Sequence, residues 1–218
     1  MDTAQNIINT ALAHDAWVYG GYVRDVVVCG EKKFNDIDIC CPENVKPLWI
    51  VRSLSARHTV KEISSKTGYD DVLYVDTYEI DGITVQFCVF DGNFTDWRET
   101  HTADLTCNLF YQSRNVNLGI RYVPEKYRTH QNPMQEIINL TKLKKFERLT
   151  DNDVLRRIKS MVRRGWTCAN KIMEDPSDYD LPFIRQIEQM QNENRRKELE
   201  KYSCLPPYII DAINRDYQ

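Results

Sequence analysis

The chain has 218 residues, of which 42% are hydrophobic and 28% are charged, a composition that excludes an intrinsically disordered chain. The formal net charge is −3 and no apolar run reaches the roughly 18 residues of a membrane helix, so the averages indicate neither a membrane protein nor an overall nucleic-acid binder. The first fifteen residues are neither basic nor continuously apolar, and we therefore expect no signal peptide and a soluble, cytoplasmic protein.

Short helical and extended patterns alternate in the first half of the chain. Apolar residues at helical spacing predict a helix over residues 3–15, and a short strand at 17–19 stops at Gly20-Gly21. A short helix follows over 23–29. The other elements expected before residue 133 are, in order, a strand over 36–40, a helix over 42–57, strands over 72–75 and 83–90 with a turn at 81–82, and a strand or helix start over 104–111.

After Pro133 the pattern becomes helical, and we expect it to remain so to the end of the chain. Its clearest element is a helix over 151–164, for which Gly165 supplies an end. Mixed elements followed by helices predict an α+β protein, with one domain over residues 1–148 and a helical one over 149–218.

The seven cysteines are an odd number and include no CxxC pair. This pattern fits neither a disulfide scaffold nor a zinc site. We expect free thiols that pack as small core side chains.

Two carboxylates, Asp36 and Asp38, lie two residues apart in the strand expected over 36–40. Alternate residues of a strand project from one face with their Cα atoms about 7 Å apart. Two such carboxylates repel each other, and a divalent cation relieves that repulsion. Hard oxygen ligands favour Mg²⁺ or Mn²⁺, so the pair is a candidate catalytic metal site, the alternative being a solvated strand face.

The Gly20-Gly21 pair follows a predicted strand and opens a predicted helix, with Arg24 in its first turn. Glycine lets the backbone approach a phosphate closely, and a helix N-terminus offers unpaired N–H groups. A phosphate-binding turn thus precedes a candidate metal site. This combination is typical of phosphoryl or nucleotidyl transfer.

The segment from Gly20-Gly21-Tyr22-Val23-Arg24-Asp25 through Gly30 to Asp36-Ile37-Asp38 resembles the GGxVRDxxxG…DxD signature of class II nucleotidyltransferases. These are CCA-adding tRNA nucleotidyltransferases and bacterial poly(A) polymerases of the DNA polymerase β superfamily. The resemblance covers roughly residues 16–168. It implies a polymerase-β-type head, with a mixed sheet and flanking helices, followed by a helical neck.

Two later segments extend the resemblance. Asp104 and Asn108 match the RRDxxxN segment, which implies contacts with ribose and triphosphate. Asp153 and Arg156 match the EDxxR segment, which implies selection of the incoming base. Three residues apart on a helix, a carboxylate acceptor and a guanidinium donor share one face, although an ion pair at a helix start is the alternative.

The sequence departs from the family pattern at three positions. Thr102 and Ala103 replace two arginines, which weakens the expected contact with the triphosphate. Gln86 occupies the position on the strand over 83–90 where the resemblance implies a third acidic metal ligand. A neutral amide cannot replace a carboxylate, so one of two ions about 3.5–4 Å apart would be held less tightly.

The resemblance implies an enzyme that uses ATP or CTP and Mg²⁺ or Mn²⁺ to add nucleotides to an RNA 3′ end. The reaction expected is CCA addition or repair on tRNA. Two alternatives are open: a nucleotidyltransferase with a protein or small-molecule acceptor, and a catalytically degenerate RNA-binding protein.

The average charge conceals a basic segment. Residues 121–165 contain twelve Lys or Arg and five Asp or Glu, a balance of +7, which leaves −10 for the rest of the chain. Arg157, Arg163 and Arg164 are the candidate RNA-binding residues of this segment. A basic segment can hold a phosphate backbone, although basic helices are also often only solvated.

Overall fold

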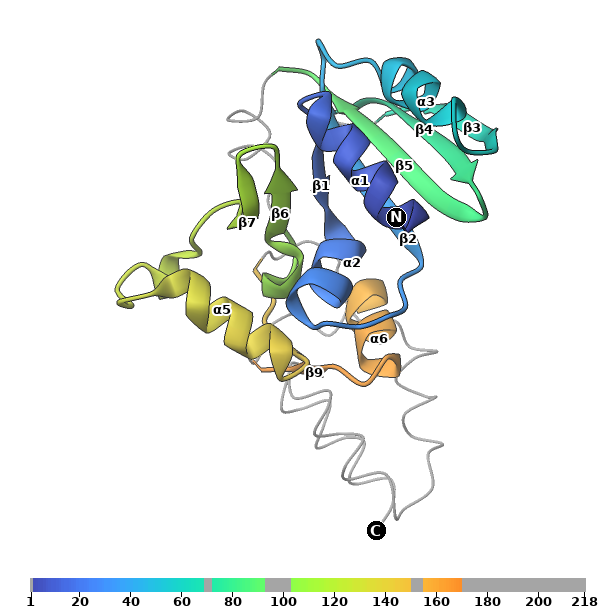
Figure 1. Ribbon diagram of the computed structural model, residues 1–218. Coiled ribbons are helices and arrows are strands. Elements are labelled where there is room, and N and C mark those ends of the chain that lie inside the picture. The colour runs from blue at the N-terminus through green and yellow to red at the C-terminus, as the bar shows by residue number, and fades with distance from the viewer. Residues whose placement is uncertain (1, 69–71, 93–102, 150–154, 170–218) are drawn as a thin grey trace. The chain divides into compact units, whose positions relative to one another are not determined.

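The structure is a computed structural model that describes residues 2–68, 72–92, 103–149 and 155–169 (Figure 1). The chain forms two compact units. Unit 1 consists of Met1–Ala103 and Asn108–Ile138, and unit 2 consists of Asp104–Cys107 and Asn139–Gln218. Residues 139–148, which the sequence prediction groups with the first domain, therefore belong to unit 2.

Unit 1 is built on a mixed sheet of seven strands, in the order β3-β4-β5-β2-β1-β6-β7. Only the central pair, β2 and β5, is parallel. The predicted α+β class is confirmed. The strands are β1 (Trp17–Tyr19), β2 (Asp36–Pro42), β3 (Val60–Thr67), β4 (Val72–Ile80), β5 (Ile83–Phe90), β6 (Phe110–Ser113) and β7 (Val116–Ile120).

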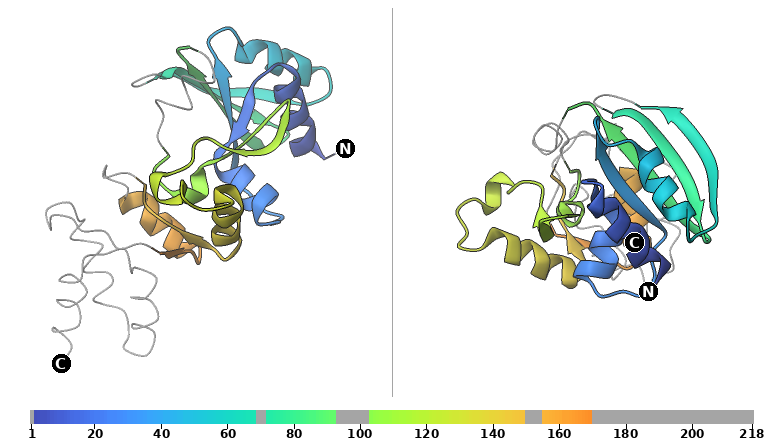
Figure 2. Two further views of the ribbon diagram at one scale, coloured as in Figure 1. Left: turned by 90° about the vertical axis from the view of Figure 1, so that its left-hand side faces the viewer. Right: turned by 45° about the horizontal axis from the view of Figure 1, so that its top comes forward.

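Helices α1 (Thr3–Ala13) and α3 (Pro47–Ser55) lie side by side on one face of this sheet (Figures 1 and 2). The buried face of β2 and β5 presents Ile37, Ile39 and Phe87, each fully buried. Each such side chain stabilises the fold by about 1.5–3 kcal/mol relative to exposure. The opposite face of the same strands carries the polar side chains described below.

The helix after β1 begins at Gly20, three residues earlier than predicted, as α2 (Gly20–Tyr22), and continues as a π-helix over Val23–Val28. The helix predicted over 42–57 is shorter. Pro42 ends β2, and α3 begins at Pro47. The residue before a proline favours extended backbone, as Lys46 shows with φ −84° and ψ 122°, and proline suits the first helical position.

The sequence prediction missed β3 and β7 and gave β4 only half its length. β3 is an edge strand with mostly exposed residues, so its sequence lacks the apolar alternation that marks a half-buried strand. The turn predicted at Asp81-Gly82 is confirmed. Both residues have positive φ angles, 47° and 83°, as a two-residue hairpin connection requires.

The segment predicted as a strand or helix start over 104–111 contains a 3₁₀ turn, Thr106–Asn108, before β6 begins at Phe110. A second 3₁₀ turn spans Glu125–Tyr127, and α5 spans Pro133–Lys142.

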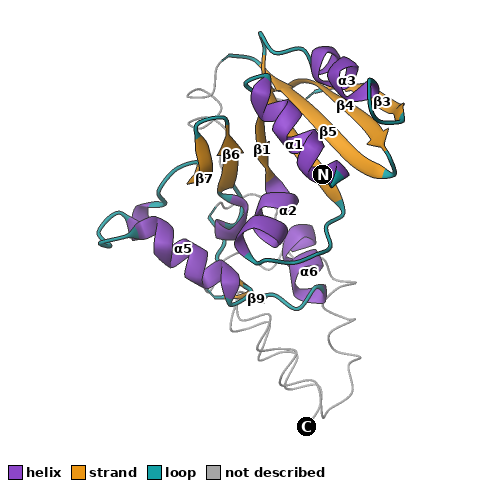
Figure 3. Cartoon of the chain, in the orientation of Figure 1, coloured by secondary structure: helices purple, strands orange, loops and turns teal. Residues whose placement is uncertain are grey.

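The described part of unit 2 contains α6 (Leu155–Arg163) and the parallel strand pair β8 (Lys145–Phe146) and β9 (Thr167–Cys168) (Figure 3). The prediction of uninterrupted helix after Pro133 is wrong at these strands, and a helical neck is not confirmed. Gly165, with φ 84°, ends α6 as predicted. No helix among the described residues is long and apolar enough to cross a membrane.

Candidate functional site

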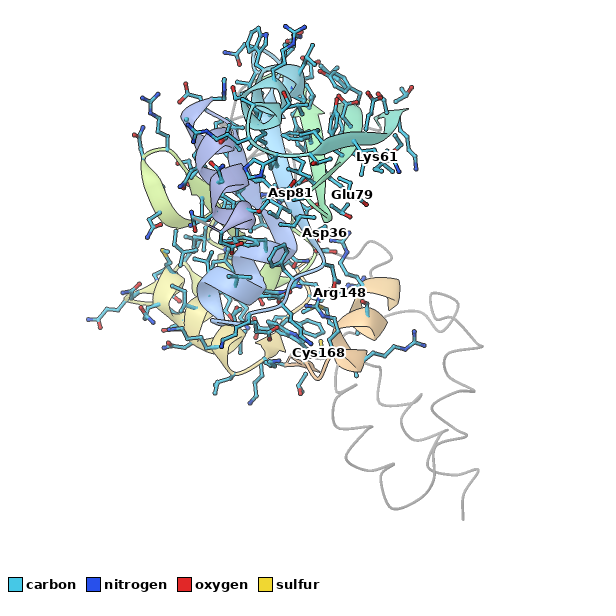
Figure 4. All side chains as sticks on the ribbon, turned by 45° about the vertical axis from the view of Figure 1, so that its right-hand side comes forward. Asp36, Lys61, Glu79, Asp81, Arg148 and Cys168 are labelled. Atoms are coloured by element: carbon cyan, nitrogen blue, oxygen red, sulfur yellow. The ribbon has the colours of Figure 1, made fainter. Side chains whose placement is uncertain are left out.

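The two candidate metal ligands, Asp36 and Asp38, lie on the face of β2 opposite the core. Both are half-buried, whereas Ile37 and Ile39 between and beyond them are fully buried on the other face. Alternation along one strand therefore holds the two carboxylates on one side of the sheet. Asp36 is one of the side chains labelled in Figure 4.

The Gly20-Gly21 turn lies directly against these carboxylates. A Cβ atom at Gly20 would lie 2.2 Å from Asp38 Oδ2, and the φ angle of Gly20 is +73°. A Cβ atom at Gly21 would lie 3.8 Å from Asp36 Oδ1. Only a residue without a side chain fits at Gly20, so the backbone of the turn approaches the acidic pair closely.

Arg24 and Asn108, two of the predicted nucleotide-binding residues, contact each other. Arg24 is buried and donates through Nε and Nη2 to the two carboxylate oxygens of Asp25 at 2.6 and 2.8 Å. Its Nη1 donates to Asn108 Oδ1 at 2.8 Å. The bidentate pair neutralises a buried charge. The bond to Asn108 ties the helix after the glycine turn to the end of the 3₁₀ turn that precedes β6.

Gln86 lies beside Asp38 on the neighbouring strand. Their Cα atoms are in register in the parallel pairing of β2 with β5, and Thr77 of β4 is in register with Gln86. Side chains in register share a face of the sheet. The amide of Gln86 therefore lies where the family resemblance implies a third acidic ligand to the metal ion. Among the described residues, no group of three or more His, Cys, Asp or Glu is placed to hold a metal ion.

The donor set nevertheless fits one magnesium-type ion. Mg²⁺ binds through one or two carboxylates and completes its octahedron with water and substrate phosphates. Asp36 and Asp38 supply the two carboxylates, and the glycine turn lies directly against them.

Tyr19 lies beside Asp38 on this face of the sheet, and Cys40 and Cys88 continue the face beyond the acidic pair. Tyr19 is in register with Asp38, and Cys40 is in register with Cys88. Burial, followed by the nearby Cys88 and Asp38, raises the pKa of Tyr19 well above its usual value. Burial also raises the pKa values of the Cys40 and Cys88 thiols, that of Cys88 to about 11. Both cysteines are free thiols, as predicted, with Cys40 buried in the core and Cys88 only partly buried.

Asp104 and Arg157 form an ion pair within unit 2. Arg157 Nε lies 2.7 Å from Asp104 Oδ2, and the Arg157 side chain is 58% exposed. The backbone oxygen of Asp104 accepts a hydrogen bond from Leu149. A predicted nucleotide-binding residue and a predicted RNA-binding residue thus contact each other through a partly solvated pair, which contributes little to stability.

The remaining predicted residues are placed only in part. Arg163 and Arg164 are exposed at the end of α6. Asp153 and Thr102 lie outside the described residues. Arg156 belongs to α6, but its side chain is not described, so base selection by Asp153 and Arg156 stays a prediction. Ala103 is buried at 3% exposure and offers no group to a phosphate.

Two neighbours of the acidic pair, Tyr19 and Thr77, are not among the predicted site residues. Tyr19 is the last residue of β1 and directly precedes the glycine turn, and this position next to the turn was the available signal. Thr77 lies in the part of β4 that was not predicted. No local signal therefore showed that it is in register with Gln86, which is itself in register with Asp38.

No family model and no curated protein matches the chain. Several solved structures match the chain. A "tRNA-processing enzyme (apo form I)" has 15% identity and a TM-score of 0.47, over 97% of this chain and 55% of that one. A Thermotoga maritima CCA-adding enzyme complexed with tRNA has 16% identity and a TM-score of 0.48, over 99% and 54% of the two chains. A CCA-adding enzyme in complex with ATP has 16% identity and a TM-score of 0.48, over 96% and 48%.

The chain therefore spans about half the length of the solved structures it matches. With identities this low and TM-scores below 0.5, the functional assignment depends on the site residues themselves.

Proposed function

We propose that the chain is a metal-dependent, template-independent nucleotidyltransferase that adds nucleotides to an RNA 3′ end, with CCA addition or repair on tRNA as its reaction. One observation carries the proposal: the Gly20-Gly21 turn lies directly against the carboxylates of Asp36 and Asp38. This places a backbone suited to phosphates beside ligands suited to a divalent cation.

Asp36 and Asp38 would hold Mg²⁺ or Mn²⁺. A bound ion would neutralise the triphosphate and lower the pKa of the attacking hydroxyl. The protein's own contribution is to position the reactants, because phosphoryl-type transfer depends mostly on alignment and charge neutralisation.

In the proposed reaction, the RNA 3′ oxygen forms a bond to the α-phosphorus of ATP or CTP. The bond from that phosphorus to the bridging oxygen breaks, pyrophosphate leaves, and the hydroxyl proton passes to solvent. The Gly20-Gly21 backbone would contact the phosphates. Arg24, held by Asp25 and Asn108, fixes the helix that follows the turn.

The other predicted residues take supporting roles in this proposal. Asp104 would contact the nucleotide, and Asp153 and Arg156 would select the incoming base. Arg163 and Arg164, exposed at the end of α6, would contact the RNA backbone. For Arg157, the ion pair with Asp104 adds a second role in holding that carboxylate.

The test is incorporation of each radiolabelled nucleoside triphosphate into bulk tRNA with Mg²⁺. We expect labelled CTP or ATP to be incorporated and Asp36→Asn/Asp38→Asn to abolish it. Glu79→Gln is the matched control because Glu79 is an exposed carboxylate on the same face of the sheet (Figure 4). Glu79 of β4 is in register with Thr84 of β5, which is in register with Asp36 of β2. If the wild-type chain and the double variant give the same background with all four nucleotides, the proposal is wrong.

A second candidate, a catalytically degenerate RNA-binding protein, is favoured by one specific observation. Gln86 puts a neutral amide beside Asp38, and the buried Ala103 provides no cation for phosphate. This candidate predicts RNA binding without measurable binding of nucleotide or Mn²⁺. Equilibrium dialysis with labelled ATP and CTP separates it from the enzyme.

A further inference from the structure

Gln86 and the glycine turn lie on opposite sides of the acidic pair. The Gly20-Gly21 turn follows β1 and lies against Asp36 and Asp38 from the β1 side of β2. On the other side of β2, strand β5 places Gln86 in register with Asp38. The acidic pair therefore has backbone on one side and a neutral amide on the other.

Neutral polar side chains continue from Gln86 on the same face of the sheet. Thr84, two residues earlier in β5, is in register with Asp36, and Thr77 of β4 is in register with Gln86. All three of these neutral side chains are half-buried. The amide of Gln86 carries two N–H donors and one acceptor oxygen. This side of the acidic pair is therefore suited to hydrogen bonds with an uncharged polar group.

The geometry of in-line displacement assigns one substrate to each side of the acidic pair. In nucleotidyl transfer, the attacking and leaving oxygens lie on opposite sides of the phosphorus atom. In the proposed function, the Gly20-Gly21 backbone contacts the phosphates, so pyrophosphate leaves on the β1 side. The acceptor hydroxyl then approaches from the opposite side, where β5 places Gln86.

An RNA acceptor brings two neighbouring hydroxyls to that side. The 3′ oxygen attacks the phosphorus atom near the ion held by Asp36 and Asp38, and the 2′-hydroxyl is attached to the adjacent ribose carbon. A hydroxyl both donates and accepts hydrogen bonds, and the amide of Gln86 matches it in both respects. An ionised carboxylate at the same position only accepts, and it would bind a metal ion instead.

We infer that Gln86 is a specificity-determining residue whose amide hydrogen-bonds the 2′-hydroxyl of the acceptor's last ribose and so selects RNA over DNA ends. The inference rests on the proposed function for the orientation of the two substrates. The 2′-hydroxyl is the group by which a protein distinguishes RNA from DNA at a given site. The net effect of one hydrogen bond corresponds to about a 2–13-fold difference in affinity between acceptors with and without this hydroxyl.

The test measures the binding of two fluorescently labelled RNA minihelices by anisotropy, one with a complete terminal ribose and one with a 2′-deoxy terminal ribose. Mg²⁺ and the α,β-methylene analogues of ATP and CTP are present, since a methylene in place of the bridging oxygen prevents transfer. The wild-type chain should bind the complete minihelix about 2–13-fold more tightly. Gln86→Met keeps the length of the side chain but removes the amide, and it should reduce this ratio to about 1.

Gln5→Met is the matched control. Gln5 is exposed on α1, which covers the other face of the sheet, and its amide donates to Asn9 Oδ1 at 2.9 Å. This variant loses the same chemical group far from the acidic pair and should keep the wild-type ratio. Circular dichroism melts verify that both variants are folded.

Equal affinity of the wild-type chain for the two minihelices would overturn the inference, as would a wild-type ratio retained by Gln86→Met. If labelled nucleotide is transferred to tRNA but the two minihelices bind equally, only the inference fails. If Gln86 determines the ratio but no nucleotide is ever transferred, the proposed function fails and the hydroxyl-binding role stands. Absence of RNA binding would overturn both.

Discussion

Replacement of Gly20 by alanine is the sharpest test of the close approach between the glycine turn and the acidic pair. The added Cβ atom would lie 2.2 Å from Asp38 Oδ2, and a tolerable contact needs at least about 3.0 Å, so the carboxylate must move by about 0.8 Å. A misplacement near 1 Å in a catalytic group costs about 100-fold in rate. The positive φ angle of +73° adds backbone strain of about 1–2 kcal/mol.

Gly30→Ala is the matched control for this prediction. Gly30 has a similar φ angle of +71°, but its added Cβ atom would meet nothing within 4 Å. Both variants should lose about 1–2 kcal/mol of stability, seen as a fall in Tm of roughly 2–8 °C. Only Gly20→Ala should lose about 100-fold in kcat/KM for nucleotide incorporation. Equal kcat/KM values in the two variants would refute the proposed role of the glycine–carboxylate contact.

Three other variants probe the same unit. Asp25→Ala leaves the buried Arg24 guanidinium without its bidentate partner and should reduce the free energy of unfolding by about 3–5 kcal/mol in urea titrations; a loss below about 1 kcal/mol would contradict the buried pair. Hydrogen bonding lowers the folded-state pKa of Asp81, so its stabilising contribution is present above the unfolded-state pKa and is lost as pH falls through the folded one. Acid titration of Asp81→Asn should therefore show a weaker fall in stability below about pH 5 than the wild type, and identical acid profiles would count against it. Gln86→Asp places a third carboxylate beside Asp38 and should tighten Mn²⁺ binding measured by electron paramagnetic resonance. Unchanged affinity would show that residues 38 and 86 do not bind the same ion.

Much of the candidate site was predictable because its parts are local in sequence. The alternation in Asp36-Ile37-Asp38 is enough to place both carboxylates on one strand face, and the glycine pair marks the end of β1. The Asp81-Gly82 turn was equally predictable, because its side chains and backbone angles are determined within two residues. The edge strand β3 was missed because its exposed residues need no apolar pattern.

Because helical and strand periodicities act over a few residues, the local pattern was enough to predict the two carboxylates, the glycine turn before them and the amphipathic pattern of α6. The folded structure is needed to show that Gly20 lies against Asp38, that Gln86 lies beside Asp38 and that Arg24 contacts Asn108, 84 positions away. The pairing of β8 with β9, which brings Lys145 to the end of α6, belongs to the same group. These contacts depend on strand order and register, which are set by burial of the whole sheet and by pairings between distant segments rather than by any local pattern.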